Sequence, residues 1–429
     1  MIYHIKELWF LIMSLFFINC NNKKESNGSP TLVDIGSNLR KMEILNLSQF
    51  TDNVRYVPLE AVENLIFTGL WDCIFSDSLI LAKDPSKCLL YDFEGNVISK
   101  IGTKGRGPGE YPYISNACFG LDKNIYIQSL NDLYEFKIDG SLLNKFQKFF
   151  FLNNESVGSW LPVNDSLFMG KICSLRGNEN DKALIFSKKG DIKYCFKNYI
   201  QFDRGRELVA EREQFANIYQ FQNEIFFKEV INDTLFLLKG FTKLIPKYII
   251  NLGKFSEPIT QRENRLKEGD FGISKEWQNY VYVENVFQTK DFLFFDCDLN
   301  SQFPAKRLTP RSVMGGISLE YNTTNALGIF NKKTKEFLFC KPTSTDNPLF
   351  TSGLYNDIDA GPRFFPMQMV NDSTMVMWFD AKQLKDHTSS DDFKDVTPKY
   401  PDKKKALEYL AKTLSEFDNP VLMFVTFNK

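Results

Sequence analysis

Four glycines recur at nearly equal intervals in the first 240 residues, each in a short turn between two apolar runs. Gly95, Gly140, Gly190 and Gly240 lie 45 to 50 residues apart. Glycine suits such turns because it adopts positive φ angles without steric cost. Two apolar runs joined by a tight turn predict a hairpin, and this period is typical of a four-stranded propeller blade. The spacing therefore favours a ring of repeated β units.

The hairpin pattern occurs six times along the chain. The clearest copy, residues 89–112 (LLYDFEGNVISKIGTKGRGPGEYP), reads as strand, turn at 94–96, strand, and a Gly/Pro loop that leads to the next unit. A single blade cannot bury both faces of its sheet, but neighbouring blades in a ring can cover them. Three later copies are continuous, at 124–146, 165–196 and 224–250. The fifth and sixth copies are each in two parts, at 286–299 with 326–341 and at 364–381 with 420–427.

Ring closure requires the two ends of the chain to meet. We expect residues 41–50 (KMEILNLSQF) to complete the last blade beside Pro420–Phe427. Helical spacing of apolar residues predicts a helix over Lys403–Ser415, and 257–278 reads as a helical or irregular excursion. The predicted fold is all-β: a six-bladed propeller of four-stranded antiparallel blades, closed by terminal strands, with short helical insertions.

Composition supports strands and excludes some partners. The chain has 41 Phe and 15% aromatic residues, which suit a pleated, half-buried surface. A net charge of −1 argues against non-specific binding to nucleic acid. Beyond Cys20, seven scattered cysteines form no CxxC pair, which fits neither a disulfide framework nor a zinc site. We interpret most of them as small core residues, with one or two disulfides within a blade as the alternative.

The N-terminus has the pattern of an export signal. An apolar run from Leu8 to Ile18 is too short to span a bilayer and ends at Cys20, before the polar tract NNKKESNGSP. This arrangement resembles a bacterial lipoprotein signal, with Cys20 as the acylation site. The interpretation gives a signal peptide at 1–19, a flexible tether at 20–37 and the propeller at 38–429; a secreted or uncleaved leader is the alternative.

Several separate stretches resemble one family. They are IGTKGRGPGEYP, YDFEGNVI, NDTLFLLKGFTKLIPKYIINLGK, YNDIDAGPRFFP and FDNPVLMFV, and they extend from about residue 38 to the end of the chain. Together they resemble the six-bladed β-propeller lipoproteins of Bacteroides and relatives, which are distantly similar to NHL-repeat propellers. The resemblance implies a propeller fold and a location in the cell envelope, anchored by lipid to the outer membrane. It implies no reaction.

Two groups of residues are candidates for ligand binding. Arg106 and Glu110 lie on the glycine loop, which lacks the GK[ST] ending of a phosphate loop. We expect them to pair with each other or a neighbouring blade, or else to line the channel mouth. Asp357 and Asp359 form an acidic turn with Asn356, and Arg363 follows it.

The acidic turn has two interpretations. Its oxygens could bind Ca²⁺, but the EF-hand spacing and terminal Glu are missing, so capping of the turn is favoured. We expect no cofactor, with Ca²⁺ as the alternative. The sequence assigns no set of metal ligands.

Other residues carry weaker signals. His387 is the one histidine after Cys20, which makes a His-based triad or His-rich metal site improbable, and we interpret it as a surface residue of a polar loop. The insertion near Lys306, Arg307 and Arg311 gathers positive charge beside Phe303 and Tyr321, as a solvated loop or as a rim for an acidic glycan or protein.

The sequence supports a binding protein more than an enzyme. We predict an envelope lipoprotein that binds a glycan, a peptide or a partner protein without catalysis, and that contacts the membrane through its lipid only. The alternative is a propeller lyase or hydrolase with a metal and carboxylates at the channel mouth, which requires acidic residues to converge there. A purely structural envelope module would instead show an exposed apolar patch.

Overall fold

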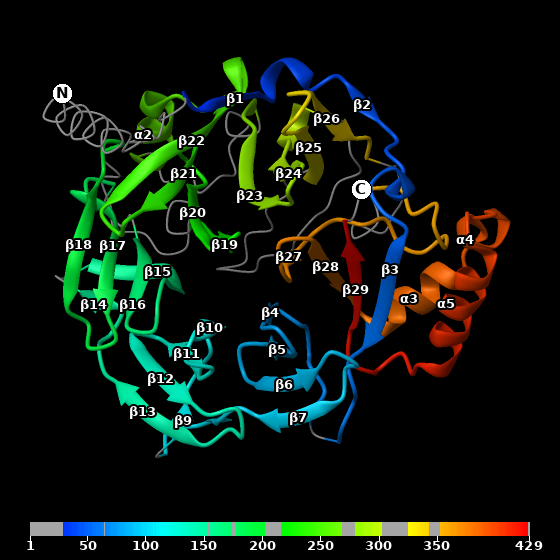
Figure 1. Ribbon diagram of the computed structural model, residues 1–429, viewed down its shortest axis with the longest axis horizontal. Coiled ribbons are helices and arrows are strands. Elements are labelled where there is room, and N and C mark those ends of the chain that lie inside the picture. The colour runs from blue at the N-terminus through cyan, green and yellow to red at the C-terminus, as the bar shows by residue number, and fades with distance from the viewer. Residues whose placement is uncertain are drawn as a thin grey trace, which may run out of the picture.

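Six β-sheets stand around a common axis in the computed structural model, which confirms the predicted propeller (Figure 1). The strands within each sheet are mainly antiparallel, and each blade has four main strands, to which a fifth is added in three of the sheets. The structure describes residues 29–63, 65–107, 109–152, 155–173, 177–201, 216–267, 279–302, 325–342 and 352–427.

Each blade is named here by its place in the ring, and its strands run from the axis outward. Blade one contains β4 (Asp72–Phe75), β5 (Leu79–Lys83), β6 (Cys88–Asp92) and β7 (Val97–Lys100). Blade two contains β10 (Asn116–Phe119), β11 (Ile125–Ser129), β12 (Asp132–Phe136) and β13 (Leu142–Phe146). Blade three contains β15 (Glu155–Pro162), β16 (Leu167–Ile172), β17 (Asp181–Ser187) and β18 (Ile192–Lys197), with β14 (Phe151–Leu152) beside β15.

The remaining blades recruit strands from the N-terminus. Blade four contains β19 (Ala216–Phe221), β20 (Glu224–Glu229), β21 (Thr234–Lys239) and β22 (Lys243–Asn251), with β1 (Thr31–Asp34) outside. Blade five contains β23 (Tyr282–Gln288), β24 (Phe292–Asp298), β25 (Asn325–Asn331) and β26 (Phe337–Cys340), with β2 (Met42–Glu43) outside. Blade six contains β27 (Gln368–Met369), β28 (Thr374–Phe379), β29 (Val421–Thr426) and β3 (Asn53–Pro58).

The hydrophobic core is divided into six main clusters, one between each pair of neighbouring blades. Strand alternation explains the division, because successive side chains point to opposite faces of a sheet. In β6, Leu89 and Tyr91 pack toward blade six, whereas Leu90 packs toward blade two. Every blade therefore buries apolar side chains on both faces, and most of the phenylalanines that the structure describes are core residues.

The turn glycines have the predicted conformation. The φ angles of Gly95, Gly140, Gly190 and Gly240 are 89°, 84°, 83° and 56°, and each lies between the third and fourth strand of its blade. In blade five Lys335 takes this place, with a φ of 64°. The hairpin period in the sequence therefore reports the blade period directly.

The strand that closes the ring is not the predicted one. Blade six is completed by β3, which pairs with β29 from Asn53↔Thr426 to Pro58↔Val421. The stretch 41–50, predicted for this role, instead supplies β2 to the edge of blade five and then a 3-10 turn over Leu47–Gln49. Gln49 accepts a hydrogen bond from the backbone N–H of Asn46, which stops the strand before blade six. The prediction that the two terminal segments close the ring is confirmed, but the segment predicted for the closing strand was wrong.

Residues 31–58 form a strap around three blades. They supply β1 to blade four, β2 to blade five and β3 to blade six. β1 and β2 pair in parallel with the outermost strands β22 and β26, so the strap covers edges that would otherwise expose unpaired backbone groups. β1 begins at Thr31, inside the span expected to be a flexible tether.

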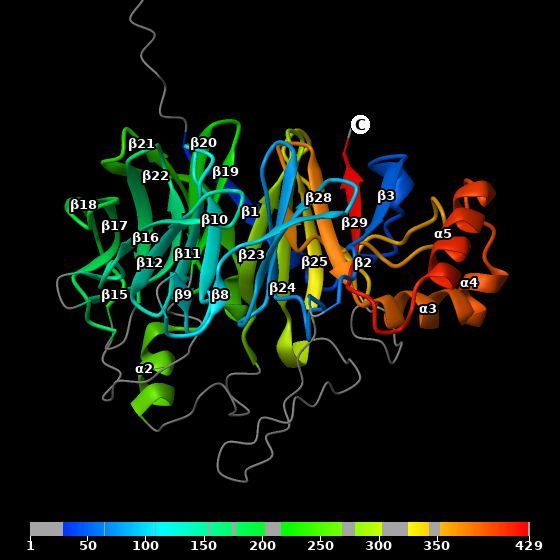
Figure 2. The same cartoon turned by 90° about the horizontal axis from the view of Figure 1, so that it is seen from below.

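Antiparallel order gives the ring two different faces. The insertion face carries the links between blades and the loops between second and third strands, and the turn face carries the other hairpin turns. The helices α2 (Ile259–Lys267), α3 (Ala381–Ser389), α4 (Asp391–Asp395) and α5 (Pro401–Thr413) follow strands that end at the insertion face. Figure 2 shows α2 and α3 at one edge of the ring and the end of β29 at the opposite edge.

The helix predictions are confirmed with small shifts in their bounds. α5 begins at Pro401 and ends at Thr413, against a prediction of 403–415. α2 lies within the excursion predicted at 257–278, of which 268–278 fall outside the described residues. No helix among the described residues has the length and hydropathy needed to cross a bilayer.

The cysteines lie where the core interpretation places them. All seven that the structure describes are free thiols, and six of them are buried. Burial raises the pKa of Cys173 to about 11, so this thiol stays protonated at neutral pH.

Replacement of Val57 by Ala tests the closure strand. Val57 is buried between blades six and one, so its truncation should lower the free energy of unfolding by about 2 kcal/mol. Leu32→Ala, at an exposed position of β1, is the control and should change it by no more than about 0.5 kcal/mol. Equal effects in denaturant titrations would contradict a closing role for β3.

Candidate functional site

The glycine loop that carries Arg106 and Glu110 is a link between blades one and two. Its short strands β8 (Thr103–Lys104) and β9 (Glu110–Tyr111) pair in parallel. The Glu110 carboxylate accepts a hydrogen bond of 2.7 Å from the backbone N–H of Gly107 and fills the space beside Gly105. Arg106 is exposed and forms no hydrogen bond or ion pair with the residues that the structure describes.

This loop lies toward the perimeter of the ring. A Cβ atom built on Gly109 would contact Leu142, which belongs to the outermost strand of blade two. Tyr111 then enters the core between blades one and two, where its hydroxyl donates to the carbonyl of Ile101 at 2.9 Å. We expected Glu110 to pair with Arg106 or a neighbouring blade, or else to line the channel mouth. The hydrogen bond that its carboxylate forms in the structure is instead to the backbone of its own loop.

The acidic turn that holds Asp357 and Asp359 is filled by donors from the protein itself. Asp357 accepts from the backbone N–H of Ser48 at 2.9 Å and from its hydroxyl at 2.5 Å. Asp359 is buried and accepts from Tyr56, Asn356 and the backbone N–H of Gly361. Burial raises the pKa of Asp359, which hydrogen bonds only partly offset. The turn thus joins the strap to blade six.

Arg363 and His387 flank the same turn. The Arg363 guanidinium lies 5.3 Å from the centre of the Tyr355 ring, and burial lowers its pKa. His387 belongs to α3 and is half-buried, with Nε2 2.9 Å from the carbonyl of Ala360, so its assignment to a polar surface loop was wrong. Burial also lowers the pKa of His387.

The predicted residues therefore form two separate groups. Asp357, Asp359 and Arg363 gather beside blades five and six, whereas Arg106 and Glu110 lie between blades one and two. Among the described residues, no three His, Cys, Asp or Glu side chains are grouped so that they could hold a metal ion. Cys20, Lys306, Arg307, Arg311, Phe303 and Tyr321 lie outside the described part of the chain.

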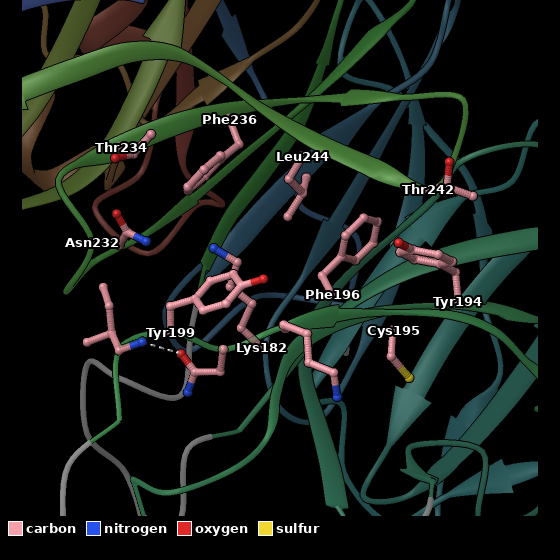
Figure 3. Close-up of a pocket in the computed structure, with 13 residues that line it drawn as sticks. Lys182, Tyr194, Cys195, Phe196, Tyr199, Asn232, Thr234, Phe236, Thr242 and Leu244 are labelled. Atoms are coloured by element: carbon pink, nitrogen blue, oxygen red, sulfur yellow. Dashed lines mark hydrogen bonds between the residues drawn. The ribbon is translucent and has the colours of Figure 1, made fainter.

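A cavity that the sequence did not reveal opens between blades three and four. Its volume is about 430 Å³, and it is bounded by β17 and β18 on one side and by β21 and β22 on the other. Neighbouring blades diverge toward the perimeter, so their outer strands leave space above the apolar cluster that they share. Figure 3 shows side chains of both blades pointing into this space.

Aromatic side chains form much of the cavity wall. Tyr194 and Phe196, two residues apart on β18, project on the same side with ring centres 5.0 Å apart. Phe236 and Leu244 project from the facing strands of blade four (Figure 3). Tyr199 lines the cavity and is 89% exposed. An aromatic side chain so exposed is available to a ligand.

Polar groups complete the wall. The amide of Asn198 is fixed, because its carbonyl oxygen accepts from the backbone N–H of Ile200 at 3.1 Å and its NH₂ group donates to the carbonyl of Glu179. Thr234 and Thr242 supply hydroxyl groups from blade four. Apolar walls with a few fixed polar groups are typical of small-molecule sites.

Lys182 is the cation at the back of the cavity. Its Nζ lies 4.1 Å from the centre of the Phe236 ring and 3.5 Å from Oε2 of Glu229. Burial lowers the pKa of Lys182, and Glu229 works in the opposite direction. Glu229 also pairs with Lys171 at 2.9 Å, so one buried carboxylate holds two buried lysines.

A sequence signal for this cavity existed but was faint. Lys182 opens the apolar run ALIF on β17, and Tyr194 and Phe196 alternate on an outer strand where one side is normally solvated. Neither pattern specifies which blade lies opposite. Only the ring places β18 against β21 and β22.

A family model described as a domain of unknown function, DUF4934, matches residues 30–426. The chain belongs to the DUF4934 family. A crystal structure of a candidate exported protein from Bacteroides fragilis aligns with this DUF4934 chain with a TM-score of 0.68 and 15% identity, over 93% of this chain and 100% of the other. This likeness agrees with the fold, and no curated protein matches the sequence.

More distant structures are also similar to parts of the DUF4934 chain. Virginiamycin B lyase from Staphylococcus aureus aligns over 70% of this chain and 78% of its own, with 10% identity and a TM-score of 0.34. A protein of unknown function from Bacteroides caccae aligns over 53% and 71%, with 9% identity and a TM-score of 0.30.

Replacement of Glu229 by Gln tests the buried ion pairs. Burial alone would raise the pKa of Glu229, yet Lys171 and Lys182 hold it below its ordinary value of 4.5. A depressed pKa in the folded state stabilises the protein above pH 4.5, and the contribution fades as the pH falls below that value. E229Q should therefore cost about 3 kcal/mol of unfolding free energy at pH 7.

The loss in E229Q should shrink in titrations below pH 4.5, where the wild-type carboxylate is itself neutralised. Glu94→Gln, at an exposed turn, is the matched control and should leave stability unchanged at both pH values. A loss that is the same at low and neutral pH would contradict the ion-pair account.

Proposed function

We propose that this DUF4934 chain is a lipid-anchored binding protein of the cell envelope, which holds a glycan in the cavity between blades three and four without catalysis. The observation that carries the proposal is the composition of the cavity wall, with four aromatic rings beside threonine hydroxyl groups and the fixed amide of Asn198. Sugar rings present C–H faces that stack on aromatic rings and hydroxyl groups that pair with amides and threonines. The exported character assigned to the similar Bacteroides fragilis protein supports an envelope location.

The cavity supports binding more than acid–base chemistry. Its nearest buried carboxylate, Glu229, is paired with two lysines and is held in its charged form. Burial raises the pKa values of Asp72 in blade one and Glu155 in blade three, and it raises the pKa of Asp296 in blade five to about 7. These three carboxylates belong to three different blades, and none of them lines the cavity.

A thermal-shift screen of the leaderless chain against a glycan panel tests the binding role. A glycan at about 100 times its dissociation constant should stabilise the protein by roughly 2.7 kcal/mol. Tyr199→Ala and Lys182→Met should each remove the shift, because they take away the exposed ring and the cavity cation.

The matched control is Tyr409→Ala, which removes an exposed tyrosine of α5 far from the cavity and should retain the full shift. A shift that needs Ca²⁺, or turnover of a glycan that EDTA stops, would favour the enzyme alternative. If no glycan of the panel shifts the thermal midpoint, the glycan proposal is contradicted and a peptide or protein ligand is favoured instead.

Replacement of Cys20 by Ser tests the anchor separately. Acylation at Cys20 should place the wild-type protein in the membrane fraction, where salt does not release it. The C20S variant should appear in the soluble envelope fraction with an unchanged thermal midpoint, because every described strand begins at Thr31 or later. Membrane retention of C20S in high salt would contradict a lipid anchor.

A further inference from the structure

Charge divides the turn face of the ring into two halves. The turns of blades three to five on the turn face contain eight lysines and five carboxylates. These turns are 163–166, 187–191, 222–224, 239–243, 289–291 and 332–336. The equivalent turns of blades one, two and six contain two lysines and seven carboxylates. They comprise residues 76–78, 92–96, 120–124, 137–141, 370–373 and 51–53. One half of the turn face is therefore basic and the other acidic.

Several of the basic residues are available to a partner. Lys188 pairs with Asp122 of blade two, Lys333 pairs with Asp291 at 2.9 Å, and Lys332 is half-buried against Gln288. The exposed lysines of these turns are Lys189, Lys243, Lys290, Lys333 and Lys335.

An aromatic residue lies at the centre of the basic half. Phe241 occupies the tip of the turn between β21 and β22, where it is 37% exposed and has a φ of 60°. This left-handed conformation is rare for a bulky residue, and the preceding Gly240 also has a positive φ, of 56°. The ring is thus held at the tip between Lys239 and Lys243 rather than packed into the core.

The chain enters the propeller beside this turn. β1 runs parallel to β22, with Thr31 opposite Tyr248, so the N-terminal end of β1 is its end nearer the turn face. Thr31 lies eleven positions after Cys20, and an extended chain of that length reaches roughly 35–40 Å. Such a tether keeps the propeller near the membrane but does not select which side faces it.

We propose that the basic half of the turn face, centred on Phe241, rests on an anionic phospholipid surface and turns the insertion face away from the membrane. Lysines near an anionic surface attract it, and an aromatic tip can enter the headgroup region. This inference rests on the proposed anchor: because the tether already keeps the chain close, weak attraction is enough to fix the orientation. The helices of the insertion face then point outward.

The test is sedimentation of the unacylated chain, starting at Asn21, with vesicles of phosphatidylethanolamine and phosphatidylglycerol. This chain retains every described strand, and its binding is independent of acylation, so failure here leaves the result for C20S untouched. We expect binding at low salt that is lost at high salt. The double variant K189E/K243E should bind at least about 25-fold more weakly, roughly fivefold for each lysine.

Two further variants separate the contributions. F241S should weaken binding about tenfold while the salt dependence stays the same, since it removes apolar contact and no charge. The matched control K123E/K137E reverses two exposed lysines on the acidic half of the same face and should bind like the wild type. Thermal midpoints confirm that all variants are folded.

Three results would overturn the proposal. The first is an absence of binding to anionic vesicles at low salt. The second is an equal loss in K189E/K243E and K123E/K137E. The third is retention on a soluble polyanion such as heparin without vesicle binding, which would assign the lysines to a soluble acidic partner.

Discussion

The pairing of β3 with β29 is the constraint on which the rest of the structure depends. A propeller blade buries both faces only if it has a neighbour on each side, so an open ring would expose two apolar sheet faces. Six register pairs from Asn53↔Thr426 to Pro58↔Val421 join the N-terminal strand to the C-terminal one. Asn419 strengthens this junction, because it donates to the carbonyl of Glu60 and accepts from the N–H of Phe67.

The strap extends this closure beyond blade six. Asp357 binds Ser48, and Asp359 binds Tyr56, so the acidic turn before blade six is fastened to the segment that leads into β3. Two residues that looked like metal ligands in the sequence thus connect the closing strand to the blade that it completes. The cavity lies at the opposite part of the ring, between blades that are continuous in sequence, where local opening does not break the ring.

Much of the fold could be predicted, because short-range patterns in the sequence specify its strands and turns. Turn glycines such as Gly95 and Gly240 mark each outer hairpin, and alternation in runs such as Leu89–Tyr91 marks strands buried on both faces. The closing strand was misplaced because 41–50 and 53–58 are both short and apolar. What separates them is a 3-10 turn at Leu47–Gln49 and pairing with residues more than 350 positions away.

The candidate site was less accessible to sequence reasoning, since it depends on contacts between blades. Lys182 and Glu229 are 47 residues apart and meet only when blade four packs on blade three. The predicted ligand-binding residues lie in two separate groups, which one sequence does not show because it does not reveal which links between blades lie near one another. Glu110 accepts a hydrogen bond within its own loop, and Asp359 accepts a hydrogen bond from the hydroxyl of Tyr56.

Hydrogen–deuterium exchange of the closing strand tests the central claim most directly. Amides of β3 and β29 form one ladder, so peptides covering 53–58 and 421–426 should exchange together and only through global unfolding. The same slow rate in both peptides, in native buffer and along a denaturant series, is the predicted result. Fast exchange of 53–58 while 421–426 stays protected would show that the ring stands without its N-terminal strand and would contradict the account.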